Sequence, residues 1–240
     1  MDREELVQSL YDDSEEELKS VYTTQKENEA KILNQISMIL LTYNIVDSVL
    51  KLTNKEKSYN YSKLSNLILN MFGKEIKSTT KGIAYILSDV TKKSFESYGL
   101  KSHKDDVLKM INGHYKGKHF SDRVWDNENQ VSKMIHKEIK DFLDGKVNVN
   151  QIKNNIENQF KADKYNVKRL VDSEIGNIQS KITEKYFKDY NIKKVRYNAT
   201  LCNTCDKCMN YHDKVFDIDY NSRPSLPQHP QCKCFYVQEI

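Results

Sequence analysis

The sequence predicts a mainly α protein: an elongated helical body followed by a small C-terminal, β-containing module that is rich in cysteine. Three observations lead to this fold class. The three prolines, Pro224, Pro227 and Pro230, all lie near the end of the 240-residue chain, so the long preceding part contains no helix-breaking proline. Apolar residues in that part recur at spacings of three and four, which is typical of amphipathic helices. All five cysteines lie in the last 39 residues.

Helical periodicity accounts for most of the chain. The clearest expected helix covers residues 25–52, where residues such as Ile32 and Ile36 form an apolar face that needs a packing partner. We therefore expect an antiparallel helical bundle. Polar residues 53–61 and the looser segment 99–121 are expected to connect helices. The expected helices cover residues 3–22, 25–52, 64–73, 79–99, 128–143, 148–161 and 164–190.

The pattern changes to alternating apolar and polar residues near the C-terminus. Residues 194–199, 216–219 and 235–237 alternate as short strands do. We therefore divide the chain into three parts. These are an N-terminal helical body (residues 1–115), a second helical part (116–193) and a module with the strands and cysteines (194–240).

The N-terminal segment is strongly acidic. Residues 1–20 carry eight acidic side chains against two basic ones, and their apolar stripe is thin. We expect this segment to be ordered against a partner, and the apolar face of 25–52 is a second candidate partner-binding element.

The longest uninterrupted aliphatic run, Met38 to Leu41, is far shorter than the roughly 18 residues of a membrane span. The N-terminus lacks the basic and apolar regions of a secretory signal, so we expect a protein made in a reducing cytoplasm.

A basic excess lies in the middle of the sequence. Residues 51–140 contain 18 Lys and Arg against 10 Asp and Glu. Such an excess permits contact with nucleic acid, which makes a nucleic-acid-binding factor the alternative function. The competing interpretation is a solvated, lysine-rich helix surface. Because lysine dominates over arginine, the excess fits loose contact with a phosphate backbone better than base recognition.

The cysteine spacing indicates a metal site. Cys205 and Cys208 form a C-x2-C pair, and the later cluster contains His229, Cys232 and Cys234. Thiolate and imidazole ligands at this spacing are typical of Zn²⁺, and four of them close a tetrahedron without an open position for water. The spacing therefore predicts structural zinc, which stabilises a module too small to fold around an apolar core alone.

Two choices within this site stay open. Cys202 and Cys205 also form a C-x2-C pair, and Cys232 and Cys234 compete for the last position. On a straight strand these last two would lie on the same side but roughly 6.5 Å apart. Residues 196–240 contain five basic and five acidic side chains, so we favour a docking or stabilising role for the module over DNA binding.

The sequence contains no recognisable catalytic motif. It lacks a glycine-rich phosphate loop, a G-x-S-x-G motif and an H-E-x-x-H motif. His212 and Asp213 are adjacent, but no nucleophile or orienting third residue accompanies them at a recognisable spacing. We therefore expect a protein that is not an enzyme. A hydrolase or nuclease with a catalytic metal is a third hypothesis.

Motifs in the second half of the chain occur in a recognisable order. Arg169-Leu170-Val171 and Ser173-Glu174 come first, then the strand Val195–Thr200 and the C-x2-C pair, and last the ending Leu226-Pro227-Gln228-His229-Pro230-Gln231-Cys232-Lys233-Cys234. In this order they resemble the C-terminal domain of tailed-phage minor head proteins, the Mu protein F-like head-morphogenesis family. The ending is the specific part. The chain departs from the family where Asp172-Ser173-Glu174 replaces the usual Arg-Thr-Glu.

The resemblance implies a minor capsid protein that binds the portal vertex inside the procapsid and supports head assembly and DNA packaging or ejection. The implied partners are the phage portal protein, then the scaffold or major capsid protein, with non-specific contact to packaged DNA. The implied location is the virion, in the capsid interior near the portal, and the host cytoplasm during assembly. Cys205 and Cys208 match the family's pair, which leaves Cys202 as an extra, and Arg169 and Glu174 are carried over as further site residues.

Overall fold

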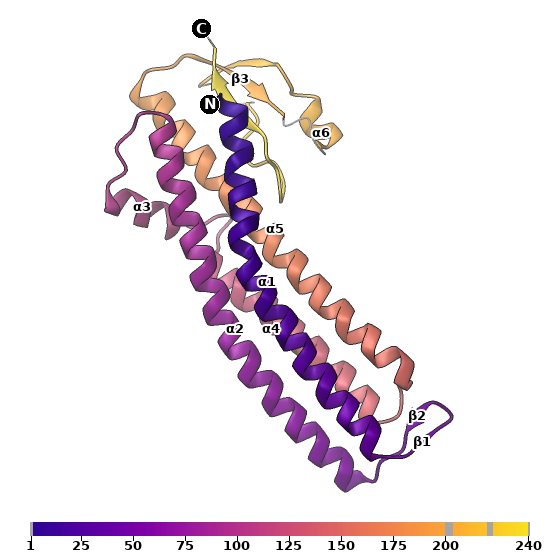
Figure 1. Cartoon of the computed structure of the whole chain (residues 1–240). Coiled ribbons are helices and arrows are strands. Elements are labelled where there is room, and N and C mark those ends of the chain that lie inside the picture. Colours follow the sequence, from indigo (N-terminus) through magenta and orange to yellow (C-terminus); the bar gives the residue numbers. More distant parts are fainter. Residues whose placement is uncertain (1, 200–203, 220–222, 240) are drawn as a thin grey trace. The chain divides into compact units, whose positions relative to one another are not determined.

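The computed structural model describes residues 2–199, 204–219 and 223–239. Its elements confirm the predicted fold class, because long helices precede a small C-terminal region of strands (Figure 1). Along the chain the elements are α1 (Arg3–Thr42), β1 (Ile45–Val46), β2 (Val49–Leu50), α2 (Asn54–Ser97), α3 (Lys104–Ile111), α4 (Phe120–Leu143), α5 (Val149–Asp189), β3 (Lys194–Asn198), α6 (Asp206–Met209), β4 (Val215–Asp217) and β5 (Phe235–Gln238).

The helices are fewer and longer than the periodicity predicts. α1 continues through residue 23, where we expected a break, and α5 joins the expected helices 148–161 and 164–190. α2 passes through Gly73 and begins within the expected connection 53–61. A glycine inside a helix costs only about 1 kcal/mol, so Gly73 does not stop a helix whose apolar face continues on both sides.

Thr53 starts α2 through a capping box. Its backbone N–H and its hydroxyl both donate to Glu56 Oε2, at 2.8 and 2.7 Å, and the Glu56 N–H donates to Thr53 Oγ1 at 3.4 Å. The hydrogen bonds from Thr53 hold the pKa of Glu56 below its ordinary value. The T-x-x-E spacing is visible in the sequence, so it is a signal from which the start of α2 can be predicted.

A short hairpin replaces the end of the helix expected at 25–52. β1 and β2 pair antiparallel, with Ile45 opposite Leu50. Asp47 and Ser48, which lie between them, have φ of 52° and 60°, the left-handed conformation of a two-residue hairpin turn. α3 is a further difference, because it lies in a segment that we expected to be irregular.

The chain forms two compact units, each built from segments that are distant in sequence. Unit 1 comprises Met1–Leu18, Ile83–Phe120 and Lys168–Ile240, and unit 2 comprises Lys19–Gly82 and Ser121–Val167. α1, α2 and α5 each contribute residues to both units. The division of the chain at residues 115 and 193 stays a prediction.

Unit 2 is a bundle in which parts of α1, α2, α4 and α5 share one apolar core. The apolar face of 25–52 is buried in this core, so our expectation that it binds a partner is wrong. It packs against the other helices of the unit. The buried residues of the core are Ile32, Ile36, Ile39, Leu50, Leu64, Ile68, Met71, Phe72, Val131, Ile135, Ile139, Phe142, Leu143, Ile152, Ile156 and Phe160.

Unit 1 combines helical segments with the C-terminal sheet. The apolar stripe of the acidic N-terminal segment, which includes Leu6 and Leu10, is buried within the chain itself, so no partner is needed to cover it. The three strands have the order β4-β3-β5, with antiparallel neighbours. A small core joins the sheet to the end of α5 and consists of the buried residues Phe187, Val195, Tyr197, Ala199 and Tyr236.

Candidate metal centre

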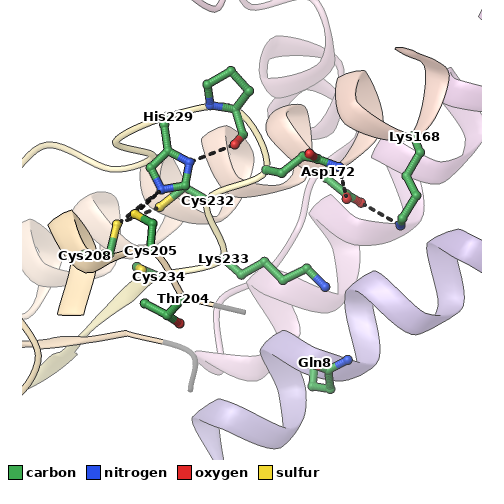
Figure 2. Close-up of a pocket in the computed structure, with 12 residues that line it drawn as sticks. Gln8, Lys168, Asp172, Thr204, Cys205, Cys208, His229, Cys232, Lys233 and Cys234 are labelled. Carbon is green, nitrogen blue, oxygen red and sulfur yellow. Dashed lines mark hydrogen bonds and ion pairs between the residues drawn. The ribbon is translucent and has the colours of Figure 1, made fainter. Parts of the chain in front are cut away.

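The residues of the C-x2-C pair and of the later cluster come together in unit 1 (Figure 2). Their potential ligand atoms form two groups of three, and within each group all atoms lie within 4.8 Å of one another. Cys205, Cys208 and His229 form the first group. Cys208, Cys232 and Cys234 form the second, so Cys208 belongs to both. The five residues line a cavity of about 440 Å³.

Two tight turns present these ligands. Cys205 precedes the one-turn helix α6, and its carbonyl oxygen accepts hydrogen bonds from the N–H groups of Cys208 and Met209, each at 3.0 Å. In the second turn, the Cys232 N–H donates to the His229 carbonyl oxygen at 3.2 Å. Each turn therefore holds two ligands close together.

The distances between ligand atoms match the edges of a tetrahedral metal site. For zinc with bonds of about 2.3 Å to sulfur and 2.0–2.1 Å to nitrogen, two sulfurs lie about 3.8 Å apart and a sulfur and a nitrogen about 3.6 Å. Cys208 Sγ lies 3.9 Å from Cys232 Sγ. His229 Nε2 lies 3.2 Å from Cys205 Sγ and 3.4 Å from Cys208 Sγ. The four described cysteines are free thiols, so this cluster is not a disulfide framework.

The backbone orients the ring of His229. Its Nδ1 lies 2.8 Å from the carbonyl oxygen of Pro230 (Figure 2). Because a carbonyl oxygen only accepts hydrogen bonds, Nδ1 carries the hydrogen, and the neutral ring presents the lone pair of Nε2 to the sulfurs of Cys205 and Cys208. This is the arrangement in which histidine binds metals in proteins.

The four thiols differ in how readily they ionise. A hydrogen bond from the Cys208 backbone lowers the pKa of Cys205. The Cys234 thiol donates to Cys232 and lowers the pKa of Cys232 to about 5, while donating that bond raises the pKa of Cys234 far above its ordinary value. Burial raises the pKa of Cys208 to about 11. A bound cation deprotonates the thiols that coordinate it, so it would offset this last effect.

Helix α5 holds the second turn in place. The backbone N–H of Gln231 donates to Ser173 Oγ at 3.1 Å, and its side-chain amide donates to Asp172 Oδ2 at 3.4 Å. Asp172 also pairs with Lys168 at 3.4 Å (Figure 2). Sequence reasoning missed this anchoring role. The available signal was that the polar residues Asp172 and Ser173 interrupt the apolar run around Leu170, Val171 and Ile175.

Gly176 of α5 allows the turn to lie close to the helix. A Cβ atom at this position would lie 3.0 Å from the carbonyl oxygen of Cys232, and 3.5 Å from both Pro227 Cβ and Tyr11 Oη. The contact at 3.0 Å is with backbone, which cannot move away as a flexible side chain can. The sequence carries a signal for this role, because an isolated glycine inside a helical pattern often marks a close approach.

The other residues singled out in the sequence lie elsewhere. The side chain of Arg169 is exposed, and Glu174 is buried beside Asn177, whose amide lies 3.5 Å from its carboxylate. Neither residue lines the cavity of the metal centre. His212 supports the end of β3, because its Nδ1 accepts a hydrogen bond from the Ala199 N–H at 3.2 Å. Cys202 lies outside the described residues.

No protein-family model, curated protein or solved structure matches this chain. None of the helices in the described part of the chain combines the length and apolar character of a membrane span. Function is therefore inferred from the fold, the metal centre and the motifs of the sequence.

Proposed function

We propose that this protein is a minor capsid protein of a tailed phage and acts in head morphogenesis. In this proposal it binds at the portal vertex inside the procapsid and supports head assembly and DNA packaging or ejection. The observation that carries the proposal is the convergence of Cys205 and Cys208 with the ending 226–234. The resemblance to the Mu protein F-like family rests on these residues. Because they lie close together in the fold, they can serve one purpose, which is to bind a metal ion.

We infer that the metal is Zn²⁺ and that its role is structural. Three thiolates and one imidazole favour zinc over hard cations such as Mg²⁺ and Ca²⁺. Cys205, Cys208, His229 and Cys232 would hold the ion. Cys232 is preferred over Cys234 because its sulfur lies 3.9 Å from that of Cys208.

A structural ion suits the size of this module. The core that joins the sheet to α5 has few fully buried residues, and a small apolar core supplies little stability. Binding of zinc to ligands from two turns supplies folding free energy instead. Four protein ligands leave no position for water, so we propose no reaction at this centre and regard the protein as non-enzymatic.

The head-morphogenesis role is tested by quantitative mass spectrometry of purified particles of the phage whose genome encodes the chain. We expect the protein in few copies and at a constant ratio to the portal protein. A minor component that docks at the portal vertex should also be lost from particles assembled without the portal. Absence of the chain from both procapsids and finished particles would contradict the proposal.

A nucleic-acid-binding factor remains the second proposal, and it rests on the basic excess of residues 51–140. Part of that excess is neutralised within the protein. Lys93 pairs with Asp13 at 2.8 Å and with Asp89 at 2.7 Å. Lysines held in such pairs are less available to phosphates, which is why the head-morphogenesis proposal comes first.

A further inference from the structure

Three acidic side chains meet inside unit 2. Glu75 of α2, Glu128 of α4 and Asp163 of α5 each have an exposed fraction of 0%. Each offers a carboxylate oxygen that lies within 4.8 Å of the other two. Within the described chain no basic side chain forms an ion pair with any of them, although the charge of Lys31 acts on Glu75 from farther away. Three like charges at this spacing in a protein interior are strongly unfavourable unless something neutralises them.

Two amides of α1 orient this carboxylate cluster. Gln25 Nε2 donates to Asp163 Oδ2 at 2.8 Å, and Asn28 Nδ2 donates to Glu75 Oε2 at 2.5 Å. Each bond satisfies one oxygen of its carboxylate. Glu75 Oε1 and Asp163 Oδ1 are buried and accept no hydrogen bond from an amide or hydroxyl donor.

Glu128 receives no hydrogen bond from the amides of Gln25 and Asn28. Both of its carboxylate oxygens are buried and accept no hydrogen bond, and the amide oxygen of Gln25 is in the same state. A proton shared between Glu75 and Asp163 would satisfy that pair. It would leave both oxygens of Glu128 and the oxygen of Gln25 without a donor, and an unsatisfied acceptor in a protein interior is unfavourable. In its ionised form the cluster therefore presents buried acceptors without donors.

Burial and mutual repulsion make the ionised form of the cluster unfavourable when no cation is bound. Burial, together with the charges of Asp163 and Glu75, raises the pKa of Glu128 to about 10. Burial and the charge of Glu75 raise the pKa of Asp163 to about 8. Ionised carboxylates at these positions require a positive charge among them, which a divalent cation supplies.

We propose that Glu75, Glu128 and Asp163, with the amide oxygen of Gln25, form a second metal site that takes a hard divalent cation of the Ca²⁺, Mg²⁺ or Mn²⁺ class. All its ligand atoms are oxygens, which these cations prefer, whereas thiolates and imidazoles select zinc. These four residues carry five buried oxygens without a hydrogen-bond partner, and six to eight ligands are usual for Ca²⁺, so one or more waters would complete the shell.

The proposed ion would connect all four helices of the unit 2 bundle. Its ligands come one each from α1, α2, α4 and α5. An ion that binds the folded bundle and not the unfolded chain stabilises the fold by mass action. The site would therefore make the stability of unit 2 depend on the concentration of the cation.

Titration of the full-length, zinc-loaded protein with Mn²⁺ tests this site, with free Mn²⁺ measured by electron paramagnetic resonance. We expect one Mn²⁺ per chain, displaced by Ca²⁺ or Mg²⁺. Glu128→Gln keeps the side-chain shape and should weaken Mn²⁺ binding by about tenfold or more. Glu27→Gln is the matched control, because Glu27 is an exposed residue of α1 in the same unit, and it should bind Mn²⁺ as the native protein does.

A native protein that binds no Mn²⁺, or a Glu128→Gln protein that binds it equally well, would overturn the proposal. Far-UV circular dichroism checks that the Glu128→Gln protein is folded. Thermal unfolding of the native protein supplies a measurement that needs no variant. Added Ca²⁺ or Mn²⁺ should raise its Tm, and a Tm that neither cation changes would show that protons alone neutralise the cluster.

Discussion

Cys208 is the residue on which the metal centre depends most. It belongs to both groups of ligands, and its sulfur lies near both His229 and Cys232. Cys234, in contrast, belongs to one group, and it donates a hydrogen bond to Cys232 from a thiol whose pKa is raised. The two cysteines should therefore differ in what their loss does to the protein.

Replacement of Cys208 by serine should release the zinc and unfold the C-terminal module. Zinc-binding free energy in small modules is folding free energy, so its loss removes most of the stability of the turns. The far-UV helical signal should stay largely intact, because most helical residues lie in α1, α2, α4 and α5. Zinc content by mass spectrometry and circular dichroism check these outcomes.

Cys234→Ser is the matched control for that experiment. It removes a thiol of the same cluster but not a proposed ligand, so the protein should keep about one zinc per chain. If Cys234→Ser loses zinc as completely as Cys208→Ser while Cys232→Ser keeps it, then Cys234 is the fourth ligand and our preference for Cys232 is wrong.

At the level of the element, α5 is both a core helix and the support of the metal centre. Asp172 and Ser173 hold the turn at Gln231 through hydrogen bonds. Gly176, one turn farther along, leaves the space that the turn occupies. The register of α5 against the second turn therefore decides whether the ligands meet.

Gly176→Ala should destabilise the metal module by about 1–3 kcal/mol, the usual cost of overpacking, and weaken zinc binding. Its added Cβ would lie 3.0 Å from the Cys232 carbonyl oxygen. Gly73→Ala is the control, because a Cβ there would meet no atom within 4 Å apart from the adjacent backbone of its own helix and its two chain neighbours. It should stabilise α2 by about 0.5–1 kcal/mol, since alanine loses less backbone entropy than glycine.

Chemical denaturation and competition for zinc with a chromophoric chelator measure both effects. Unchanged zinc affinity in the Gly176→Ala protein would mean that the turn with His229 and Cys232 can move away from α5 without separating its ligands.

At the level of the whole molecule, charge is unevenly distributed but partly compensated. The acidic N-terminal segment pairs with basic residues of the same unit, as Asp13 does with Lys93 and Glu15 with Lys168, each at 2.8 Å. The basic region 51–140 contributes residues to both compact units. These features are more typical of a solvated helical surface than of a continuous phosphate-binding groove.

We therefore expect binding to double-stranded DNA to be weak and to depend little on salt. Between 50 and 200 mM salt, the affinity should fall by no more than about tenfold, which corresponds to about two phosphate contacts. Fluorescence anisotropy with a labelled duplex measures this dependence. A fall of about 10³ or more would support the nucleic-acid alternative over a role confined to protein docking.

Much of the fold could be predicted because its signals are local. Periodic positions such as Ile32 and Ile36 mark helix faces, and the spacing of Cys205 and Cys208 marks a metal-binding turn. The Thr53–Glu56 capping box was equally local, although the polar composition around it favoured a connection. The hairpin at 45–50 was missed because a short apolar run fits a helix or a strand equally well.

The carboxylate cluster was missed for a different reason. Glu128 occupies the helix face that also carries the buried residues Val124 and Val131, and Asp163 lies between buried Phe160 and Val167. An acidic residue on an apolar face is a signal of burial. It does not reveal which acidic residues of other helices lie opposite.

By itself, the sequence determined the fold class and the set of side chains that could hold a metal ion, since helical periodicity and turn spacing depend on residues near one another in the chain. Tertiary structure alone decided that the two ligand turns meet over α5, that Gly176 makes room for them, and that three carboxylates share one buried position. Those outcomes depend on the packing of segments far apart in sequence, and such packing is set by the shape and burial of whole helices.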